Sequence, residues 1–295
     1  MGRRYDTVTF LSDLGSHDEA TGVVRAVLRD LAPEVAVVDL AHDLPAFDIR
    51  AASLALARSV AYLPQGVIIA AVDPSPGERP AVAIEVADGA GVFLGPDNGL
   101  LAPGVAMAGG AQRAVALTDT AWHLADSPST FRARDVFAPV AARLCAGVDL
   151  ADLGEPIDPV LLMPGVVPLP RDEGDSLAAE VLWVDRFGNA QLNVGPDDLE
   201  QRWGMGPAST VTVTVRDVAG QPVRRMATWV VSHSQVTQGA LGLIVDATGM
   251  LALVANRSSA AIEVGVAAGD QVLLTPAVGE RDARGVTTPV NLQRR

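Results

Sequence analysis

The sequence predicts an α/β N-terminal domain with a parallel-rich sheet, followed by a smaller, mostly β C-terminal domain. In the first half, short apolar runs typical of buried strands alternate with stretches of helical periodicity. Near the middle lies a segment rich in proline, glycine and acidic residues, and beyond it strand-like runs follow one another with few helices between them. We place the domains at residues 1–160 and 177–295, with a linker at 161–176.

The first part of the chain predicts a βαβαβ unit, which implies parallel strands joined by right-handed crossovers. Its apolar runs have the length of strands, and the stretches between them carry apolar residues at helical spacing. Residues 80–118 then predict shorter strands around a turn, and a helix follows. The expected strands are 7–11, 35–40 and 67–72, the expected helices are about 18–31, 48–62 and 134–145, and the turn is 95–99.

The second part of the chain follows a stretch, residues 154–176, whose composition is typical of an interdomain linker. Strand-like patterns dominate after it, which predicts a β-rich domain. The expected strands are 177–193, 209–216, 222–231, 241–254 and 271–275.

Composition excludes several classes of function. The formal net charge of −13 and the pI of about 4.6 oppose nucleic-acid binding, which needs a basic surface. No apolar run reaches the ~18 residues that a membrane helix needs, and no apolar segment follows the N-terminal arginines as in a signal peptide. Cys145 is the single cysteine, so no intrachain disulfide forms and a reducing cytoplasm is expected.

Two carboxylates follow expected strands: Asp13 after the first and Asp73 after the third. In an open α/β sheet, ligands bind outside the carboxyl ends of the strands. Carboxylates there repel phosphate and suit ribose hydroxyls, a cationic ligand or proton transfer. The glycine-rich phosphate-binding motifs are missing from the sequence, which favours a nucleoside-like ligand without a polyphosphate. The alternative is that these residues only cap a turn or a helix.

Other polar groups allow two interpretations each. Arg79 shares a proline-stiffened loop with Asp73, where it either keeps the carboxylate ionised or forms an incidental surface pair. Asp185 and Asn189 lie in a strand–turn–strand pattern that either holds a small polar ligand or is a β-turn. The histidines (His17, His42, His123 and His233) have no metal-ligand spacing, so no metal is expected, and no G-x-S-x-G nucleophile motif is present.

Taken together, these motifs resemble the S-adenosyl-L-methionine hydroxide adenosyltransferase family, which is related to fluorinase and chlorinase. The resemblance covers nearly the whole chain and rests on the order and spacing of its motifs. The matching stretches are Phe10–Gly15 (FLSDLG), Val38–Asp43 (VDLAHD), Val72–Pro74 (VDP), Gly95–Leu101 (GPDNGLL), Thr130–Phe131 with Arg134–Pro139 (RDVFAP), Asp185–Asn189 (DRFGN) and Gly249–Asn256 (GMLALVAN).

The family implies a homotrimer that binds S-adenosyl-L-methionine between one subunit's N-terminal domain and a neighbour's C-terminal domain. Substrate-binding positions carry over residue by residue. Asp13 is expected on the ribose hydroxyls, Phe47 and Asp48 in the loop that closes on ribose and methionine, Phe131 in the matching Thr–Phe motif, Asp185 and Asn189 on methionine, Trp229 stacked near adenine, and the Asn256 loop on the adenine edge.

The resemblance also implies a reaction: water attacks the ribose 5′ carbon, giving adenosine and L-methionine without a cofactor. Hydroxide-transferring members carry Asp where the halogenases carry Tyr, and here the residue is Asp73. Ala133 takes the halide-binding position and offers no hydroxyl. Asp73 and Arg79 match two members of the family triad, but Arg132 stands in place of its histidine. A slow hydrolase is therefore expected; the alternatives are a non-catalytic S-adenosylmethionine-binding protein and a chlorinase-like 5′-halogenase.

Overall fold

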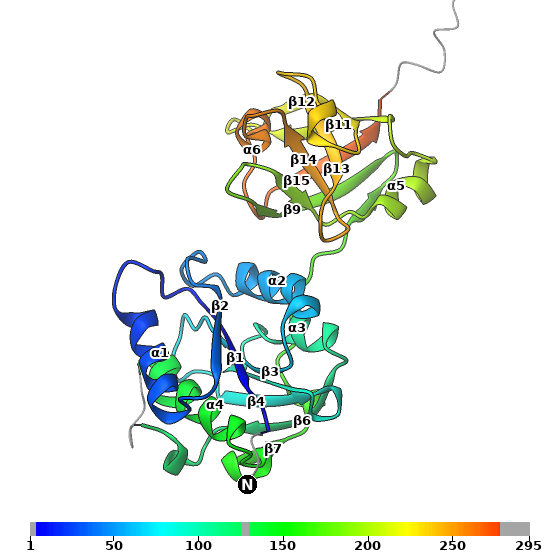
Figure 1. Cartoon of the computed structure of the whole chain (residues 1–295). Coiled ribbons are helices and arrows are strands. Elements are labelled where there is room, and N and C mark those ends of the chain that lie inside the picture. The colour runs from blue at the N-terminus through cyan, green and yellow to red at the C-terminus, as the bar shows by residue number, and fades with distance from the viewer. Residues whose placement is uncertain (1–3, 125–129, 278–295) are drawn as a thin grey trace, which may run out of the picture. The chain divides into compact units, whose positions relative to one another are not determined.

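The computed structural model describes residues 4–124 and 130–277 (Figure 1). The chain divides into two compact units, Met1–Val167 and Pro168–Arg295, so the division falls inside the segment expected to be a linker. Within the described ranges, no helix is long and apolar enough to cross a membrane.

The first unit is built on a seven-stranded sheet with the order β2-β1-β3-β5-β4-β6-β7. β2, β1, β3 and β5 pair in parallel, whereas β4, β6 and β7 each pair antiparallel with their neighbours. The expected parallel-rich sheet is confirmed. Its strands are β1 Thr7–Ser12, β2 Ala36–Ala41, β3 Gly66–Ala71, β4 Ala81–Val86, β5 Gly91–Pro96, β6 Ala111–Ala116 and β7 Glu155–Ile157.

Helices cover both faces of this sheet, so its central strands are apolar on both sides. In β3, Val67 and Ile69 pack into one core with α1 and α4, while Ile68 and Ala70 pack into a second core with α2 and α3. In Figure 1, α1 lies beside α4 and α2 beside α3. The helices are α1 Ala20–Leu31, α2 Ile49–Ser59, α3 Ala102–Met107 and α4 Ala138–Cys145.

Short turns connect these elements, and one of them is unusual. A π-helical turn, Ala133–Phe137, runs directly into α4. Such turns occur often at functional sites because they displace side chains from the regular helical positions. The 3₁₀ turns are Val60–Tyr62, Ala87–Gly89, Thr120–Trp122, Leu150–Leu153, Pro159–Leu161 and, in the second unit, His233–Gln235.

The second unit is a β structure with the strand order β10-β14-β13-β12-β11-β15-β9-β8. Because β9 pairs with β10 as well as with β15, the strands from β10 to β9 close into a barrel-like ring. The expected β-rich C-terminal domain is confirmed. Its elements are β8 Arg171–Glu173, β9 Ser176–Val184, β10 Ala190–Leu192, α5 Pro196–Trp203, β11 Thr210–Arg216, β12 Pro222–Trp229, β13 Leu241–Val245, β14 Leu251–Ala255, α6 Ala260–Val264 and β15 Gln271–Pro276.

Several element boundaries differ from the sequence prediction. The run 241–254 is a hairpin, β13 and β14, because Asp246 folds the chain back by accepting from Thr248 N and Met250 N. The run 177–193 is likewise split by a turn into β9 and β10. The first helix begins at Ala20 rather than near residue 18. The stretch 154–176, whose composition is typical of a linker, supplies β7 to one sheet and β8 to the other, and only β8 lies within the linker placed at 161–176.

Candidate functional site

Two aspartates lie at the same edge of the first sheet. Asp13 directly follows β1, and Asp73 comes two residues after β3. β1 and β3 are parallel neighbours, so their carboxyl ends meet at this edge. The geometry predicted from the sequence for these two residues is therefore present.

Asp73 is paired with a side chain far away in the sequence. Arg132 Nη1 donates to Asp73 Oδ2 at 2.8 Å and to the Arg79 carbonyl oxygen at 3.0 Å. The Arg132 and Asp73 side chains are 11% and 15% exposed, so the pair is largely shielded from water. Arg79 itself is exposed and contributes its backbone to this contact. The cation that holds Asp73 is thus Arg132, where the loop spacing had suggested Arg79.

The π-helical turn sets where Arg132 lies. Arg132 caps this turn, and its guanidinium carbon is 5.8 Å from the ring centroid of Phe137. The neighbouring Arg134 is held locally, by the buried Asp135 carboxylate and over the Phe131 ring at 5.1 Å. Of the two arginines, Arg132 is therefore the one placed at Asp73.

Asp13 holds the loop that precedes α2. Its Oδ2 accepts from Phe47 N at 2.8 Å, and Asp48 caps the helix by accepting from Ala51 N at 2.8 Å. Phe47 has a φ of +66°, which is uncommon for a residue with a side chain, and its ring is 68% exposed. The loop thus presents an aromatic ring to solvent beside the Asp13 carboxylate.

A histidine to which the sequence analysis gives no role, His123, interacts electrostatically with Arg132. His123 Nε2 is buried and has no hydrogen-bond partner among the described residues. Burial lowers the pKa of His123; the negative charge of Asp119 opposes this shift, and the positive charge of Arg132 adds a smaller lowering. The net lowering of the pKa, which is due first to burial, favours the neutral imidazole.

In the second unit, Asp185 and Asn189 are bonded to each other. Asp185 Oδ1 accepts from Phe187 N at 2.8 Å and from Asn189 N at 2.9 Å, while Oδ2 accepts from Asn189 Nδ2 at 2.8 Å. The β-turn interpretation is therefore present in the structure. The same turn also exposes the Phe187 ring, at 74%, beside a cavity of about 400 Å³ that Asp185 lines.

The two residues expected near adenine have different environments. Asn256 Nδ2 donates to the Val236 carbonyl oxygen at 2.8 Å, beside a cavity of about 580 Å³. Trp229 is 5% exposed and packs in the core of the barrel. Alternation along β12 places its ring inside, so the structure gives Trp229 a packing role and the predicted stacking has no support.

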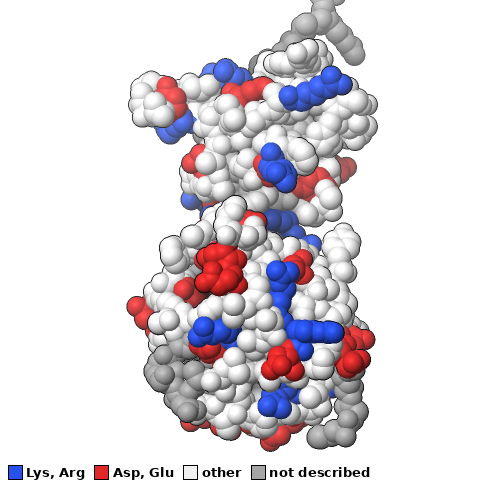
Figure 2. Space-filling view, turned by 60° about the vertical axis from the view of Figure 1, so that its left-hand side comes forward, with Lys and Arg blue, Asp and Glu red and all other residues white. Residues whose placement is uncertain are grey.

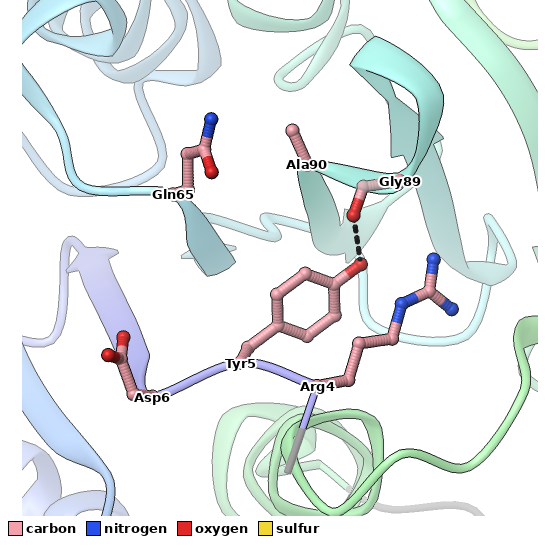
Figure 3. Close-up of a pocket in the computed structure, with 6 residues that line it drawn as sticks. All are labelled: Arg4, Tyr5, Asp6, Gln65, Gly89 and Ala90. Atoms are coloured by element: carbon pink, nitrogen blue, oxygen red, sulfur yellow. Dashed lines mark hydrogen bonds between the residues drawn. The ribbon is translucent and has the colours of Figure 1, made fainter. Parts of the chain in front are cut away.

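A further cavity, of about 530 Å³, lies at the opposite edge of the first sheet (Figure 3). Its lining residues stand before the amino ends of β1, β3 and β5, away from Asp13 and Asp73. Two of its polar side chains are engaged by the protein itself: Tyr5 Oη donates to the Gly89 carbonyl at 2.9 Å and Arg4 pairs with Glu85 at 2.7 Å. Ligands of open parallel sheets bind at the carboxyl edge, which favours the aspartate site over this cavity.

On the face that Figure 2 presents, acidic and basic side chains of the described residues alternate in small groups without a continuous basic stripe. Across the described part of the chain, no group of three or more His, Cys, Asp or Glu side chains is placed to hold a metal ion.

Comparison with known proteins identifies the family. Models for the SAM hydroxide adenosyltransferase N-terminal and C-terminal domains match residues 8–154 and 179–273. The chain is 41% identical to the (R)-S-adenosyl-L-methionine hydrolase of Salinispora tropica, covering 91% of this chain and 97% of the relative, and 38% identical to that of Thermus thermophilus, covering 90% and 98%. A fluorinase from an Actinoplanes species is 24% identical, covering 92% of this chain and 97% of the relative.

A solved structure has the same fold as this chain. A conserved protein from Thermotoga maritima superposes with a TM-score of 0.81 at 28% identity, covering 91% of this chain and 99% of that one. With both domain models matched in order, the chain belongs to the S-adenosyl-L-methionine hydroxide adenosyltransferase family.

Proposed function

We propose that this protein hydrolyses S-adenosyl-L-methionine to adenosine and L-methionine by in-line attack of water at the ribose 5′ carbon. The observation that carries the proposal is Asp73, a shielded carboxylate at the carboxyl edge of the sheet. Its aspartate identity matches the hydroxide-transferring members and not the halogenases. The higher identity to hydrolases, 41% and 38%, than to a fluorinase, 24%, supports the same choice.

The chemistry needs a base more than an acid. The sulfonium leaves as a neutral thioether, so no proton has to be supplied to it. A carboxylate is a far weaker base than hydroxide, so Asp73 does not hold hydroxide at rest. It orients a water molecule and takes its proton as the new bond forms. Attraction between the developing oxyanion and the substrate cation, in a site shielded from water, lowers the barrier.

Arg132 positions Asp73 but does not relay its proton, because a guanidinium stays protonated in proteins. Its Nη1 hydrogen fixes one carboxylate oxygen and leaves the other for water. We therefore expect Arg132→His to raise kcat by up to roughly 10²-fold, within the range that a positioned proton acceptor contributes. Single-turnover product formation measures the effect, with Arg132→Gln as the control that donates a hydrogen bond but does not titrate. Equal rates for the wild type and Arg132→His would contradict it.

The substrate contacts extend this proposal to both units. Asp13 takes the ribose hydroxyls and the Phe47 loop closes over them, while the Asp185–Asn189 turn and the Asn256 loop take the methionine and adenine ends. We propose a homotrimer in which neighbouring subunits complete each site, as the family resemblance implies, in the cytoplasm. Sedimentation of the full chain with and without substrate tests the assembly, and a monomer that turns over substrate would contradict it.

The first experiment is incubation of the purified protein with S-adenosyl-L-methionine in ¹⁸O-labelled water, with and without chloride, followed by mass spectrometry. We expect labelled adenosine and methionine, and Asp73→Asn to lower the rate roughly 10²–10⁴-fold. Asp158→Asn is the matched control, because Asp158 only caps a 3₁₀ turn through Val160 N. Chlorodeoxyadenosine would identify a halogenase, and tight binding without product would identify a binding protein.

A further inference from the structure

A hydrogen-bonded chain of three side chains, running from the buried Ser12 to the exposed Asp39, begins next to Asp13. Ser12 Oγ and His42 Nδ1 are 2.8 Å apart, and His42 Nε2 and Asp39 Oδ1 are 3.0 Å apart. The Phe10 ring packs against the imidazole, with centroids 4.6 Å apart. Asp39 is held in turn by Arg25 Nη1 at 2.9 Å. The chain connects the end of β1 with β2 and the residues just after it.

The residue types are those of a serine hydrolase, but the burial excludes that role. Ser12 is 0% exposed and belongs to β1, so no substrate reaches its hydroxyl. The Asp39 carboxylate only accepts, so Nε2 donates to it, and Nδ1 forms the hydrogen bond with the Ser12 hydroxyl. Each ring nitrogen of His42 thus holds a neighbouring side chain.

We infer that His42 is a positioning residue for Asp13, acting through Ser12; this inference rests on the proposed ribose-binding role of Asp13. His42 contacts the chain on both sides of that aspartate. Its side chain bonds Ser12, and its carbonyl oxygen accepts from Gly15 N at 2.8 Å. Asp13 is therefore bracketed by two contacts from one residue of the neighbouring strand end.

Further bonds join the loops after β1 and β2 into one unit. Ser16 N donates to Asp43 Oδ1 at 3.0 Å, and Phe47 N donates to Asp13 Oδ2 at 2.8 Å. Asp13 Oδ1 has no hydrogen bond to any described protein group, which leaves it for a ribose hydroxyl. His42 thereby sets the position of the free carboxylate oxygen and of the backbone that carries the exposed Phe47 ring.

The inference predicts a loss of binding affinity only for nucleosides that carry ribose hydroxyls. In Ser12→Ala and His42→Phe, which remove the hydrogen-bonded chain, we expect adenosine affinity to fall roughly 10-fold, about the loss for one weakened hydrogen bond to a charged group. Binding of 2′,3′-dideoxyadenosine, which lacks both hydroxyls, should not change. The double variant should lose no more than either single variant, because both break the same chain. Calorimetric titration of the full-length protein measures these affinities.

Ser59→Ala is the matched control, since Ser59 Oγ donates only to the Ala55 carbonyl oxygen within α2. Asp13→Ala is the reference for complete loss of hydroxyl recognition. Equal losses for both nucleosides, or unchanged adenosine affinity in both variants, would overturn the inference. If the wild type binds adenosine but does not hydrolyse S-adenosyl-L-methionine, only the proposed reaction is contradicted and the inference on His42 still holds. A wild type that binds neither nucleoside overturns the inference as well, because Asp13 then has no ribose to hold.

Discussion

Asp13 and Asp185, assigned to opposite ends of the same ligand, are held in different ways. Asp13 uses one oxygen for Phe47 N, a residue 34 positions away, and its surroundings are fixed by side chains from a neighbouring strand. Asp185 uses both oxygens within its own turn, on Phe187 and Asn189. Tertiary contacts position the Asp13 carboxylate and leave one of its oxygens free to bind a ligand. The Asp185 carboxylate instead stabilises the backbone of its own turn.

The largest effect is expected from substituting these two aspartates in parallel. Asp13→Ala should weaken adenosine binding roughly 10- to 10²-fold, the range for hydrogen bonds to a charged group, with little change in stability. Asp185→Ala should lower the unfolding free energy of the second unit by about 1–3 kcal/mol, because several N–H donors lose their acceptor. Titration calorimetry and denaturant unfolding on both variants separate the effects. A stability loss in Asp13→Ala that exceeds that in Asp185→Ala would reverse the comparison.

A smaller effect on the unfolding free energy is expected from adding a side chain at a glycine of the Asp185 turn. Gly188 has a φ of +83°, and a Cβ there would lie 2.6 Å from Ser259 Cα. Gly249 has the same φ, with nothing within 4 Å of its Cβ position. Gly249→Ala should therefore cost only the strain of about 1–2 kcal/mol, and Gly188→Ala should cost more. Unfolding free energies of the two variants, compared directly, test whether close packing adds to strain; equal costs would show that it does not.

The smallest effect concerns His123 in the first unit. Its pKa is lowered in the folded state, first by burial, so folding favours the neutral form. The stabilisation that comes from this pKa shift is therefore fully present above the unfolded-state pKa of about 6.5, and it is lost as the pH falls below that value. His123→Gln should flatten the fall in the unfolding free energy between neutral and mildly acidic pH. Thermal unfolding at several pH values measures this; identical pH profiles for wild type and His123→Gln would contradict it.

Much of the first unit could be predicted because its signals are local. Apolar runs such as 67–72 have the length of buried strands, and parallel order then places Asp13 and Asp73 at one edge. The turn Asp185–Asn189 was also visible, because glycine and asparagine favour turns. Boundaries were less accurate where a turn interrupts an apolar run, as between β13 and β14.

The partners of the site residues could not be predicted in the same way. Arg132 reaches Asp73 across 59 positions, and Ser12 meets His42 across 30, so neither contact leaves a spacing pattern. Trp229 illustrates a different difficulty: the family resemblance suggests that it stacks near adenine, but strand alternation places its ring in the core of the barrel. Local periodicity predicts elements and their faces, whereas contacts between elements depend on the whole fold.

The closed ring of the second unit also determines where that unit tolerates added residues. In a ring, each strand's register is fixed by neighbours on both sides, so an extra residue inside one strand has no free edge toward which to shift. The turn between β11 and β12 is different: Asp217 closes it by accepting from Ala219 N and Gln221 N, and Val218 at its tip is fully exposed. A fluorescent reporter or an epitope joined at Val218 would follow the protein while leaving every strand of the ring in place.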